Sequence, residues 1–353
     1  MRTDLNTLKK RLKNDILSGR FGPSGSRLPP LRELCGSGEG SYVTLQRAVR
    51  ELREEGIVTE FGKKEYLTCG VAHRSSELAK LLAKRDSRTV GLYVRSVENP
   101  FFAAMSSGVT DSLNSKGYTV LISSGGDDRE KEKEIIRKFV SLGCAGIISF
   151  PGGQKPGEIY DCCPLPVVFM GKELAGVKRP CVAVKNETAA RMAAKHLYDE
   201  GYRDFAYVGS KTVDRASDKR YLGFAGELER LGQAPPAVFF VNGFGDERGY
   251  SVIKSFFRSA KRPVGVFCYH DLIAAGLYGT LSSVGRSVPG DAGIVGFDDL
   301  FVAPLLSPAL STVSYSFDSM AQKATSLLFE LIEGGSAPDI TYVNPVLTVR
   351  GSS

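Results

Sequence analysis

Apolar positions recur with helical spacing in the first 70 residues of this 353-residue chain. Two amphipathic stripes, each with spacings of three and four residues, predict two helices: Leu5, Leu8, Leu12 and Ile16, and later Leu45, Ala48, Val49 and Leu52. A shorter helix between them follows Pro29 and Pro30. Prolines are tolerated in a first helical turn because its N–H groups have no partner within the helix. We therefore expect three helices, the last two separated by a turn.

The last of these helices has a capped start and a polar outer face. The Ser41 hydroxyl can accept a backbone N–H of the first turn, and Gly56 marks the end. The face opposite the apolar stripe carries Tyr42, Thr44, Gln46, Arg47 and Arg50. These side chains can contact phosphates and base edges, so the helix suits a DNA groove. A solvated basic face without a nucleic-acid partner gives the same pattern.

A short hairpin follows this helix. The runs IVTEF and EYLTC are joined by the turn Gly62-Lys63-Lys64, which puts two lysines at the tip. Three helices and a hairpin make residues 1–70 a winged helix-turn-helix (α+β) domain. Residues 71–88 follow as a linker, in which a short helix is possible.

From Thr89 the pattern changes to short apolar runs. Nine of them predict strands buried on both faces: TVGLYV, YTVLIS, AGIISF, LPVVFM, PCVAV, DFAYVG, AVFFVN, PVGVFC and AGIVGF. They alternate with helical stretches at 101–116, 129–142, 187–200, 220–231, 247–258 and 271–284. This alternation predicts parallel, doubly wound α/β sheets. Because nine strands are too many for one comfortable sheet, we expect residues 89–353 to form two Rossmann-like lobes with a ligand cleft between them, at the carboxyl ends of the strands.

Charge separates the same two regions. Residues 1–88 contain 18 Lys+Arg and 11 Asp+Glu, so 18 − 11 = +7, and the remaining 265 residues contain 28 of each. The whole net charge of +7 therefore surrounds the predicted helix-turn-helix. A basic domain on a neutral body favours a polyanionic partner such as double-stranded DNA.

The sequence lacks the motifs that would indicate several other classes of protein. The seven cysteines have irregular spacing without a CxxC pair, which argues against a metal site or a disulfide framework. No apolar run approaches the length of a membrane span or a signal peptide, so we expect a cytoplasmic protein without a membrane partner. The chain has three scattered histidines and no GxSxG, P-loop or HExxH motif. We expect neither an enzyme nor a cofactor.

Residues 1–70 resemble the DNA-binding domain of the GntR family. The resemblance is carried by Leu28-Pro29, Arg32-Glu33-Leu34, Ser41 with Thr44, Ala48, Leu52 and Glu55-Gly56-Ile57. It implies that Arg32, Ser41, Thr44 and the wing tip, Lys63 and Lys64, contact DNA. Tyr42 and Gln46 stand where the family usually has arginine. Together with Arg47 they complete the predicted set of DNA-binding residues. Because these two positions differ from the family, the resemblance does not predict which operator sequence the helix reads.

Residues 89–353 resemble the effector domain of the LacI/GalR family, which shares its fold with periplasmic sugar-binding proteins. The matching segments occur in order and include ENPFF (98–102), AAKHLYDEGYRDFAYVG (193–209), RYLGF (220–224), VFCYHDLIAAG (266–276), VPGDAGIVGFDD (288–299) and LSPALSTV (306–313). The resemblance implies a DNA-binding transcriptional regulator that responds to a small-molecule effector, and we expect it to be a repressor that the effector relieves. A sugar is the expected effector. The helix-turn-helix implies a homodimer, because half-site reading mirrors two-fold symmetry.

Candidate effector contacts lie after the predicted strands. Asn99 offers a donor and an acceptor, while Phe101 and Phe102 can stack on a sugar ring or simply belong to the core. The resemblance gives Arg220 the role of a rigid donor to hydroxyls, with a surface pair to Asp218 as the alternative.

Three further positions complete the predicted site. The Asp271 carboxylate can accept two hydroxyls, cap its helix, or do both. His270 beside it would make binding pH-dependent near a pH of about 6.5. Phe244 matches a family position that often holds an aromatic against the ligand. Asp298-Asp299 is expected to be a structural turn. A purine- or other metabolite-responsive regulator, or a sugar-binding transport component, remain as alternatives.

Overall fold

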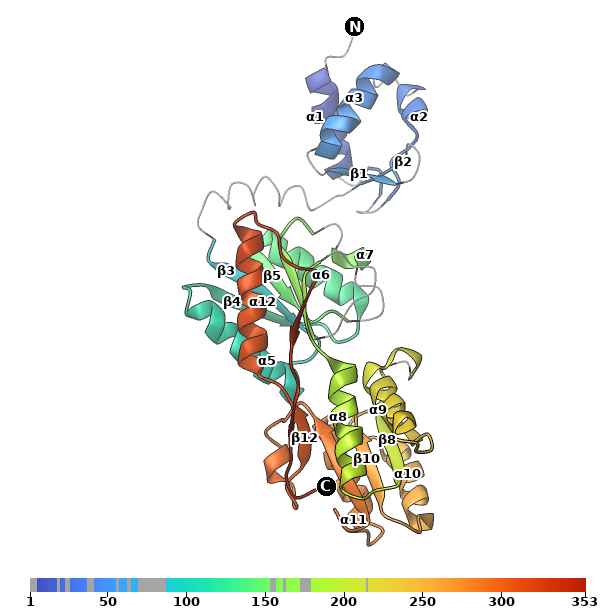
Figure 1. Ribbon diagram of the computed structural model, residues 1–353. Coiled ribbons are helices and arrows are strands. Elements are labelled where there is room, and N and C mark those ends of the chain that lie inside the picture. The colour runs from blue at the N-terminus through green and yellow to red at the C-terminus, as the bar shows by residue number, and fades with distance from the viewer. Residues whose placement is uncertain are drawn as a thin grey trace.

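The chain forms a winged helix-turn-helix followed by two α/β lobes, between which it passes back and forth (Figure 1). The structure is a computed structural model, and it describes residues 5–17, 20–22, 26–36, 41–54, 57–61, 65–68, 87–152, 157–160, 163–171, 179–213 and 215–353. Lys63, Lys64 and most of the predicted linker lie outside these ranges. Within them, no helix has the length and apolar character that crossing a membrane requires.

The winged helix has the elements that the sequence predicts. These are α1 (Leu5–Leu17), α2 (Leu31–Gly36), α3 (Tyr42–Glu54), β1 (Val58–Phe61) and β2 (Glu65–Thr68). The strands pair antiparallel with Val58 opposite Thr68. The two predicted apolar stripes meet in one core, where Leu8, Leu12 and Leu45 are buried. The fold class of this domain is therefore confirmed.

Lobe 1 is built on a six-stranded sheet in the order β13-β7-β6-β5-β3-β4, in which every pair is parallel. Its strands are β3 (Thr89–Val94), β4 (Thr119–Ser124), β5 (Gly146–Ser149), β6 (Val167–Gly171), β7 (Cys181–Val184) and β13 (Ile340–Val343). Its helices are α5 (Pro100–Asn114), α6 (Arg129–Ser141), α7 (Gly157–Tyr160) and α12 (Phe317–Ile332).

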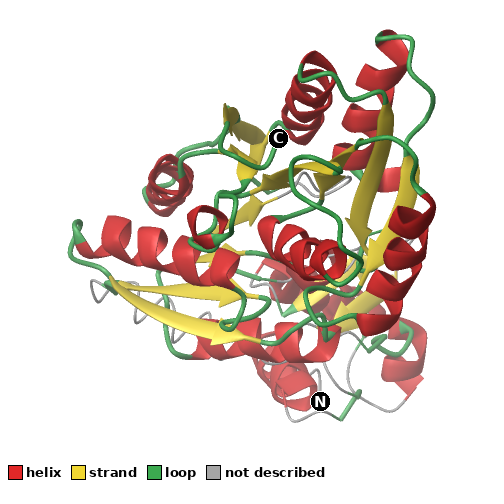
Figure 2. Cartoon of the chain, turned by 90° about the horizontal axis from the view of Figure 1, so that it is seen from below, coloured by secondary structure: helices red, strands yellow, loops and turns green. Residues whose placement is uncertain are grey.

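Lobe 2 has a second six-stranded sheet in the order β14-β12-β11-β10-β8-β9. Its strands are β8 (Asp204–Ser210), β9 (Ala237–Val241), β10 (Val264–Cys268), β11 (Ala292–Phe297), β12 (Ser311–Ser314) and β14 (Val346–Thr348), and β14 alone among them runs antiparallel to its neighbour. Its helices are α8 (Asn186–Asp199), α9 (Lys219–Arg230), α10 (Glu247–Ser259) and α11 (Asp271–Ser282), with short 3₁₀ turns at Arg215–Ser217 and Ala303–Leu305. Helices cover the sheets of both lobes (Figure 2).

The predicted double lobe is confirmed, and all nine predicted strands are present as β3 to β11. Aspartates explain several of the helix starts, because Asp128, Asp218 and Asp246 accept backbone N–H groups of α6, α9 and α10. The sequence did not predict β12, β13, β14 or α12. They flank the later crossings of the chain, which passes between the lobes three times, after β7, after β12 and after β13 (Figure 1).

Candidate functional site

A cavity of about 370 Å³ lies between the two lobes. Six of its polar side chains lie at or shortly after the carboxyl ends of strands: Arg95 after β3, Asp127 after β4, Ser210 at the end of β8, Asn242 after β9, His270 after β10 and Asp298 after β11. Parallel strands present their carboxyl ends at one edge, so residues far apart in the sequence converge there. The volume lies within the range of small-molecule sites.

Arg220, near the start of α9, is held rigidly at the cavity wall. Its Nε donates to Asn186 Oδ1 at 2.9 Å, and its Nη1 donates to the Tyr269 carbonyl. The guanidinium also stacks over the Phe297 ring, 3.5 Å from the ring centroid. The predicted alternative, a surface pair with the Asp218 side chain, is not what the structure shows, because Asp218 accepts the Arg220 backbone N–H as a helix cap. A preformed donor fork of this kind can recognise vicinal oxygens.

Asp298 faces Arg220 across 4.0 Å and is almost fully buried. Tyr315 donates its hydroxyl to Asp298 Oδ1 at 2.9 Å. Burial raises the pKa of this carboxyl, while Arg220 and the Tyr315 hydrogen bond oppose the rise. A structural turn was expected at Asp298-Asp299, and Asp298 is both a residue of that turn and part of the cavity wall.

Lobe 1 contributes a second pair of opposite charges that the sequence analysis missed. Arg95 donates from Nε and Nη2 to the two carboxylate oxygens of Asp127, at 2.7 and 2.9 Å. Both residues line the cavity and remain partly exposed. Both follow a strand, as the predicted residues Asn99 and His270 do, so the same reasoning applied to every strand would have found them.

Three predicted contacts from lobe 1 do line the cavity. Asn99 caps α5 by accepting the Phe101 N–H at Oδ1, 3.0 Å away. Phe101 and Phe102 pack edge to face with ring centroids 5.0 Å apart, and Phe102 is buried while Phe101 is half-buried. Each ring therefore belongs to the core and also lines the cavity, and stacking on a sugar ring stays a prediction.

His270 also lines the cavity, and its Nδ1 accepts the Ile273 N–H at 3.2 Å to cap α11. Burial, together with the positive charge of Arg220, lowers the pKa of His270 to about 4. The ring is therefore neutral at neutral pH, with Nδ1 as the acceptor and Nε2 carrying the proton. The expected titration near pH 6.5 does not fit this environment.

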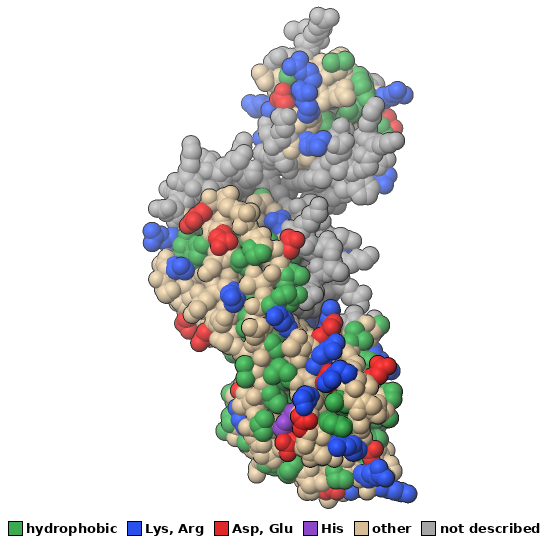
Figure 3. Space-filling model, viewed as in Figure 1, with side chains coloured by type: hydrophobic (Ala, Val, Ile, Leu, Met, Phe, Trp, Pro, Cys, Tyr) green, Lys and Arg blue, Asp and Glu red, His purple; other side chains and the backbone are tan. Residues whose placement is uncertain are grey.

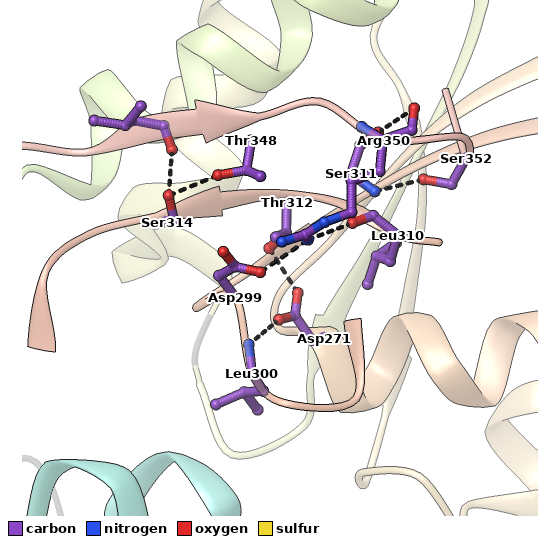
Figure 4. Close-up of polar contacts among 11 residues, drawn as sticks. Asp271, Asp299, Leu300, Leu310, Ser311, Thr312, Ser314, Thr348, Arg350 and Ser352 are labelled. Carbon is purple, nitrogen blue, oxygen red and sulfur yellow. Dashed lines mark hydrogen bonds and ion pairs between the residues drawn. The ribbon is translucent and has the colours of Figure 1, made fainter. Parts of the chain in front are cut away.

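Asp271 and Phe244 are placed elsewhere than the sequence analysis expected. Asp271 is fully buried; its Oδ2 accepts the Leu300 N–H and its Oδ1 accepts the Thr312 hydroxyl, both at 2.7 Å (Figure 4). Burial raises the pKa of this carboxyl to about 8. Neither residue is among those lining the cavity, and the Phe244 side chain is 63% exposed. Asp271 misses the cavity because the protein's own donors occupy both of its oxygens.

The predicted DNA-binding face is present on α3. Ser41 Oγ accepts the Thr44 N–H at 3.2 Å, which confirms the cap. Tyr42, Gln46 and Arg47 are exposed, as is Arg32 on α2. Figure 3 shows Lys and Arg side chains over the winged helix. Val43, which the sequence analysis passed over, is 64% exposed beside them and offers an apolar surface of the kind that contacts a thymine methyl group.

No metal site competes with this arrangement, because the described residues contain no group of three His, Cys, Asp or Glu side chains able to hold an ion. The cavity thus offers hydrogen-bond donors, acceptors and aromatic edges.

Comparisons with known proteins match both parts of the chain. A family profile described as "Bacterial regulatory proteins, gntR family" matches residues 5–64, and one described as "Periplasmic binding protein-like domain" matches residues 194–353. The HTH-type transcriptional regulator GalR of Escherichia coli is 30% identical over 278 residues, covering 78% of this chain and 81% of that protein.

Two further comparisons extend this match. The arabinose metabolism transcriptional repressor of Geobacillus stearothermophilus is 26% identical over 363 residues, covering 98% of this chain and 96% of that protein. The solved periplasmic binding protein/LacI transcriptional regulator of Alkaliphilus metalliredigens, complexed with D-xylulofuranose, is 26% identical with a TM-score of 0.67. This alignment covers 76% of this chain and 99% of that one.

Proposed function

Because this chain belongs to the LacI/GalR family of transcriptional regulators, with a GntR-type helix-turn-helix at its N-terminal side, we propose that a sugar bound between its lobes controls its binding to a DNA operator. The observation that carries the proposal is the cavity itself, in which rigid polar groups and aromatic edges from both lobes converge. The names of the arabinose repressor and of the D-xylulofuranose complex support a sugar over other small molecules.

The charges of the cavity favour a neutral polyhydroxylated ligand. Arg95 is paired with Asp127, Arg220 faces Asp298, and His270 is neutral, so the opposite charges balance. A phosphorylated or strongly acidic ligand would need an excess of positive charge that these pairs do not leave. Hydroxyl groups instead need paired donors and acceptors, which carboxylates and guanidinium groups provide.

The proposed mechanism is closure of the lobes around the sugar. A ligand that contacts Asn99 or Asp127 in lobe 1 and Arg220 or Asp298 in lobe 2 binds the closed form better than the open one. The difference is a coupling free energy, typically about 1–3 kcal/mol. We propose that the closed form has the lower operator affinity, so that the sugar relieves repression.

We further propose that the regulator is a homodimer, since paired recognition helices read two half-sites. Phe301 and Leu305, just after the cavity turn, are 68% and 73% exposed, and a second copy would cover them. Phe301→Glu with Leu305→Glu should give a monomer in light scattering that still binds sugar but has lost operator affinity. Leu142→Glu, at an equally exposed position in lobe 1, is the matched control. A double variant that stays dimeric contradicts this interface.

A thermal-shift screen tests the proposed ligand class. The panel is D-galactose, L-arabinose, D-ribose and D-xylulose, with adenine, guanine and hypoxanthine as the competing class. We expect at least one sugar to raise the melting temperature and no base to do so. Arg220→Met should abolish the shift, whereas Arg230→Met, which breaks the Glu227 ion pair on the same helix, should keep it. A rise in melting temperature with a nucleobase and with none of the sugars would contradict the proposal.

A further inference from the structure

A left-handed turn forms one wall of the cavity. Asp298 and Asp299 have φ angles of 98° and 51°, and they are the two non-glycine residues with positive φ in the described part of the chain. Residues with a Cβ rarely adopt this conformation, and they keep it where surrounding structure holds them. Asp298 and Leu300, the residue that follows the turn, both line the cavity. The shape of the cavity therefore depends on what holds this turn.

One tether comes from the start of α11. The buried Asp271 carboxylate accepts the Leu300 N–H at Oδ2 and the Thr312 hydroxyl at Oδ1, both at 2.7 Å. The Asp271 carboxyl group also packs tightly against β11. A Cβ added at Gly296 would lie only 2.2 Å from Asp271 Oδ1, so only glycine leaves room for the carboxyl group there. Asp271 thus links the turn to β12 and packs against β11, and it is not among the residues that line the cavity.

The other tether comes from the C-terminal tail. Arg350 Nη1 lies 2.8 Å from Asp299 Oδ1 and also donates to the Leu310 carbonyl at 2.8 Å. The Arg350 N–H donates to Ser311 Oγ at 2.8 Å, and Ser352 Oγ accepts the Ser311 N–H at the same distance. Figure 4 shows these residues gathered behind the turn. Arg350 therefore reaches the turn from an anchored tail.

We propose that Arg350 and Asp271 are positioning residues for the effector site, because they fix the turn that aims Asp298 into the cavity. Neither residue lines the cavity. The inference rests on the proposed function for what binds there, while the link from Arg350 to the turn stands on the contacts alone. It also gives Asp271 a role in the site other than contact with the ligand.

Arg350 is the better residue to test, because loss of the fully buried Asp271 endangers folding. Arg350→Met keeps the length of the side chain but removes the ion pair with Asp299 and the bond to Leu310. Arg286→Met is the matched control. Arg286 Nη1 pairs with Asp291 Oδ1 at 2.7 Å in the same lobe, and Nη2 donates to the Ala260 carbonyl, but this pair precedes β11, at its amino end.

Hydrogen–deuterium exchange of the ligand-free protein tests the link to the turn directly. We expect peptides covering residues 297–306 to exchange faster in Arg350→Met than in the wild type, because the Leu300 N–H loses its fixed geometry toward Asp271. Arg286→Met should leave these peptides unchanged. Equal exchange in Arg350→Met and the wild type would overturn the proposal whatever the ligand is.

Calorimetric titration then tests the consequence for binding, with the panel sugar that gives the largest thermal shift. We expect Arg350→Met to weaken binding at least about tenfold, Arg350→Lys to restore part of it, and Arg286→Met to change it less than about twofold. Equal losses in Arg350→Met and Arg286→Met would mean a merely structural role and overturn the proposal. If no sugar binds the wild type, the proposed function fails, and the exchange experiment alone decides the positioning role.

Discussion

Single residues in the cavity carry structural and ligand-facing roles together. Asn99 and His270 each cap a helix with one side-chain atom while lining the cavity, and Arg220 is stacked and hydrogen-bonded before any ligand arrives. Side chains fixed in this way lose little conformational entropy on binding. At the scale of residues, the hydrogen bonds that cap two helices at their N-termini therefore also hold side chains of the site in place.

His270 gives a prediction about pH. Its pKa is about 4 in the folded protein and about 6.5 in the unfolded chain. The unfolded chain thus binds more protons between these values, and the stability due to neutral His270 is present above pH 6.5 and is lost as the pH falls toward 4. Each pKa unit corresponds to about 1.4 kcal/mol, so the full effect approaches about 3 kcal/mol.

Comparison with His270→Asn isolates this effect, because asparagine retains a cap acceptor but does not titrate. Urea denaturation gives the free energy of unfolding of both proteins. As the pH falls from 6.5 to 4, the wild type should lose stability relative to His270→Asn. The difference between the two free energies should stay flat between pH 7 and 8. Asp271 acts in the opposite direction, since its pKa of about 8 makes its contribution fall as the pH rises from about 4. A flat difference throughout would show that His270 titrates normally.

Some residues of the site could be predicted from their neighbours in the sequence, and others depend on partners far away in the sequence. The rule that polar residues follow strand ends led to Asn99 and His270, and applied evenly it also reaches Arg95, Asp127 and Asp298. Asp271 obeys the same rule and yet turns away. Its partners, Leu300 and Thr312, lie 29 and 41 positions later, so no local pattern shows that they occupy both carboxylate oxygens.

Among the elements, α3 was predictable because its determinants are local. The Ser41 cap and the apolar positions Leu45, Val49 and Leu52 lie within 12 residues of one another, and all three apolar residues are fully buried. The strands β12, β13 and β14 and the helix α12 were not predicted. The strands are three or four residues long, and their pairing partners are distant, as when Thr312 lies opposite Thr348. Contacts of that separation are set by topology and not by periodicity.

The start of α3 yields a prediction at this scale. Ser41→Ala removes the acceptor for the Thr44 N–H and should lower the stability of the helix by about 1 kcal/mol. Ser41→Asn, which can still cap, should keep most of it. Thermal unfolding of the full chain, followed by circular dichroism, measures the change, and fluorescence anisotropy measures operator affinity.

The two readouts separate capping from DNA contact. If Ser41 acts through the cap, the asparagine variant retains both stability and affinity, while the alanine variant loses both. If the hydroxyl itself contacts DNA, as the GntR resemblance implies, the asparagine variant is stable but binds the operator more weakly. An alanine variant unchanged in both respects would contradict the cap and the contact together.

At the scale of the whole molecule, two charged residues of the cavity are hydrogen-bonded to segments that join the lobes. Arg220 bonds Asn186, the first residue of α8, directly after the chain leaves β7 of lobe 1. Asp298 bonds Tyr315, which lies between β12 of lobe 2 and α12 of lobe 1. Each ligand-facing charge of lobe 2 therefore touches a crossover between the lobes. Under the proposed lobe closure, a sugar that contacts either charge would alter a bond to a segment that joins the lobes.

Loss of the Asn186 amide should therefore weaken coupling more than binding. In Asn186→Ala, Arg220 keeps its bond to the Tyr269 carbonyl and its stacking on Phe297, so we expect sugar affinity to fall only a few-fold. The factor by which sugar changes operator affinity, measured by anisotropy, should fall toward 1. Asn186→Asp, which still accepts from Arg220 Nε, is the control and should retain the factor. Reciprocity adds an internal check, because operator DNA must change sugar affinity by that same reduced factor. A variant with normal coupling would show that the lobes respond through other contacts.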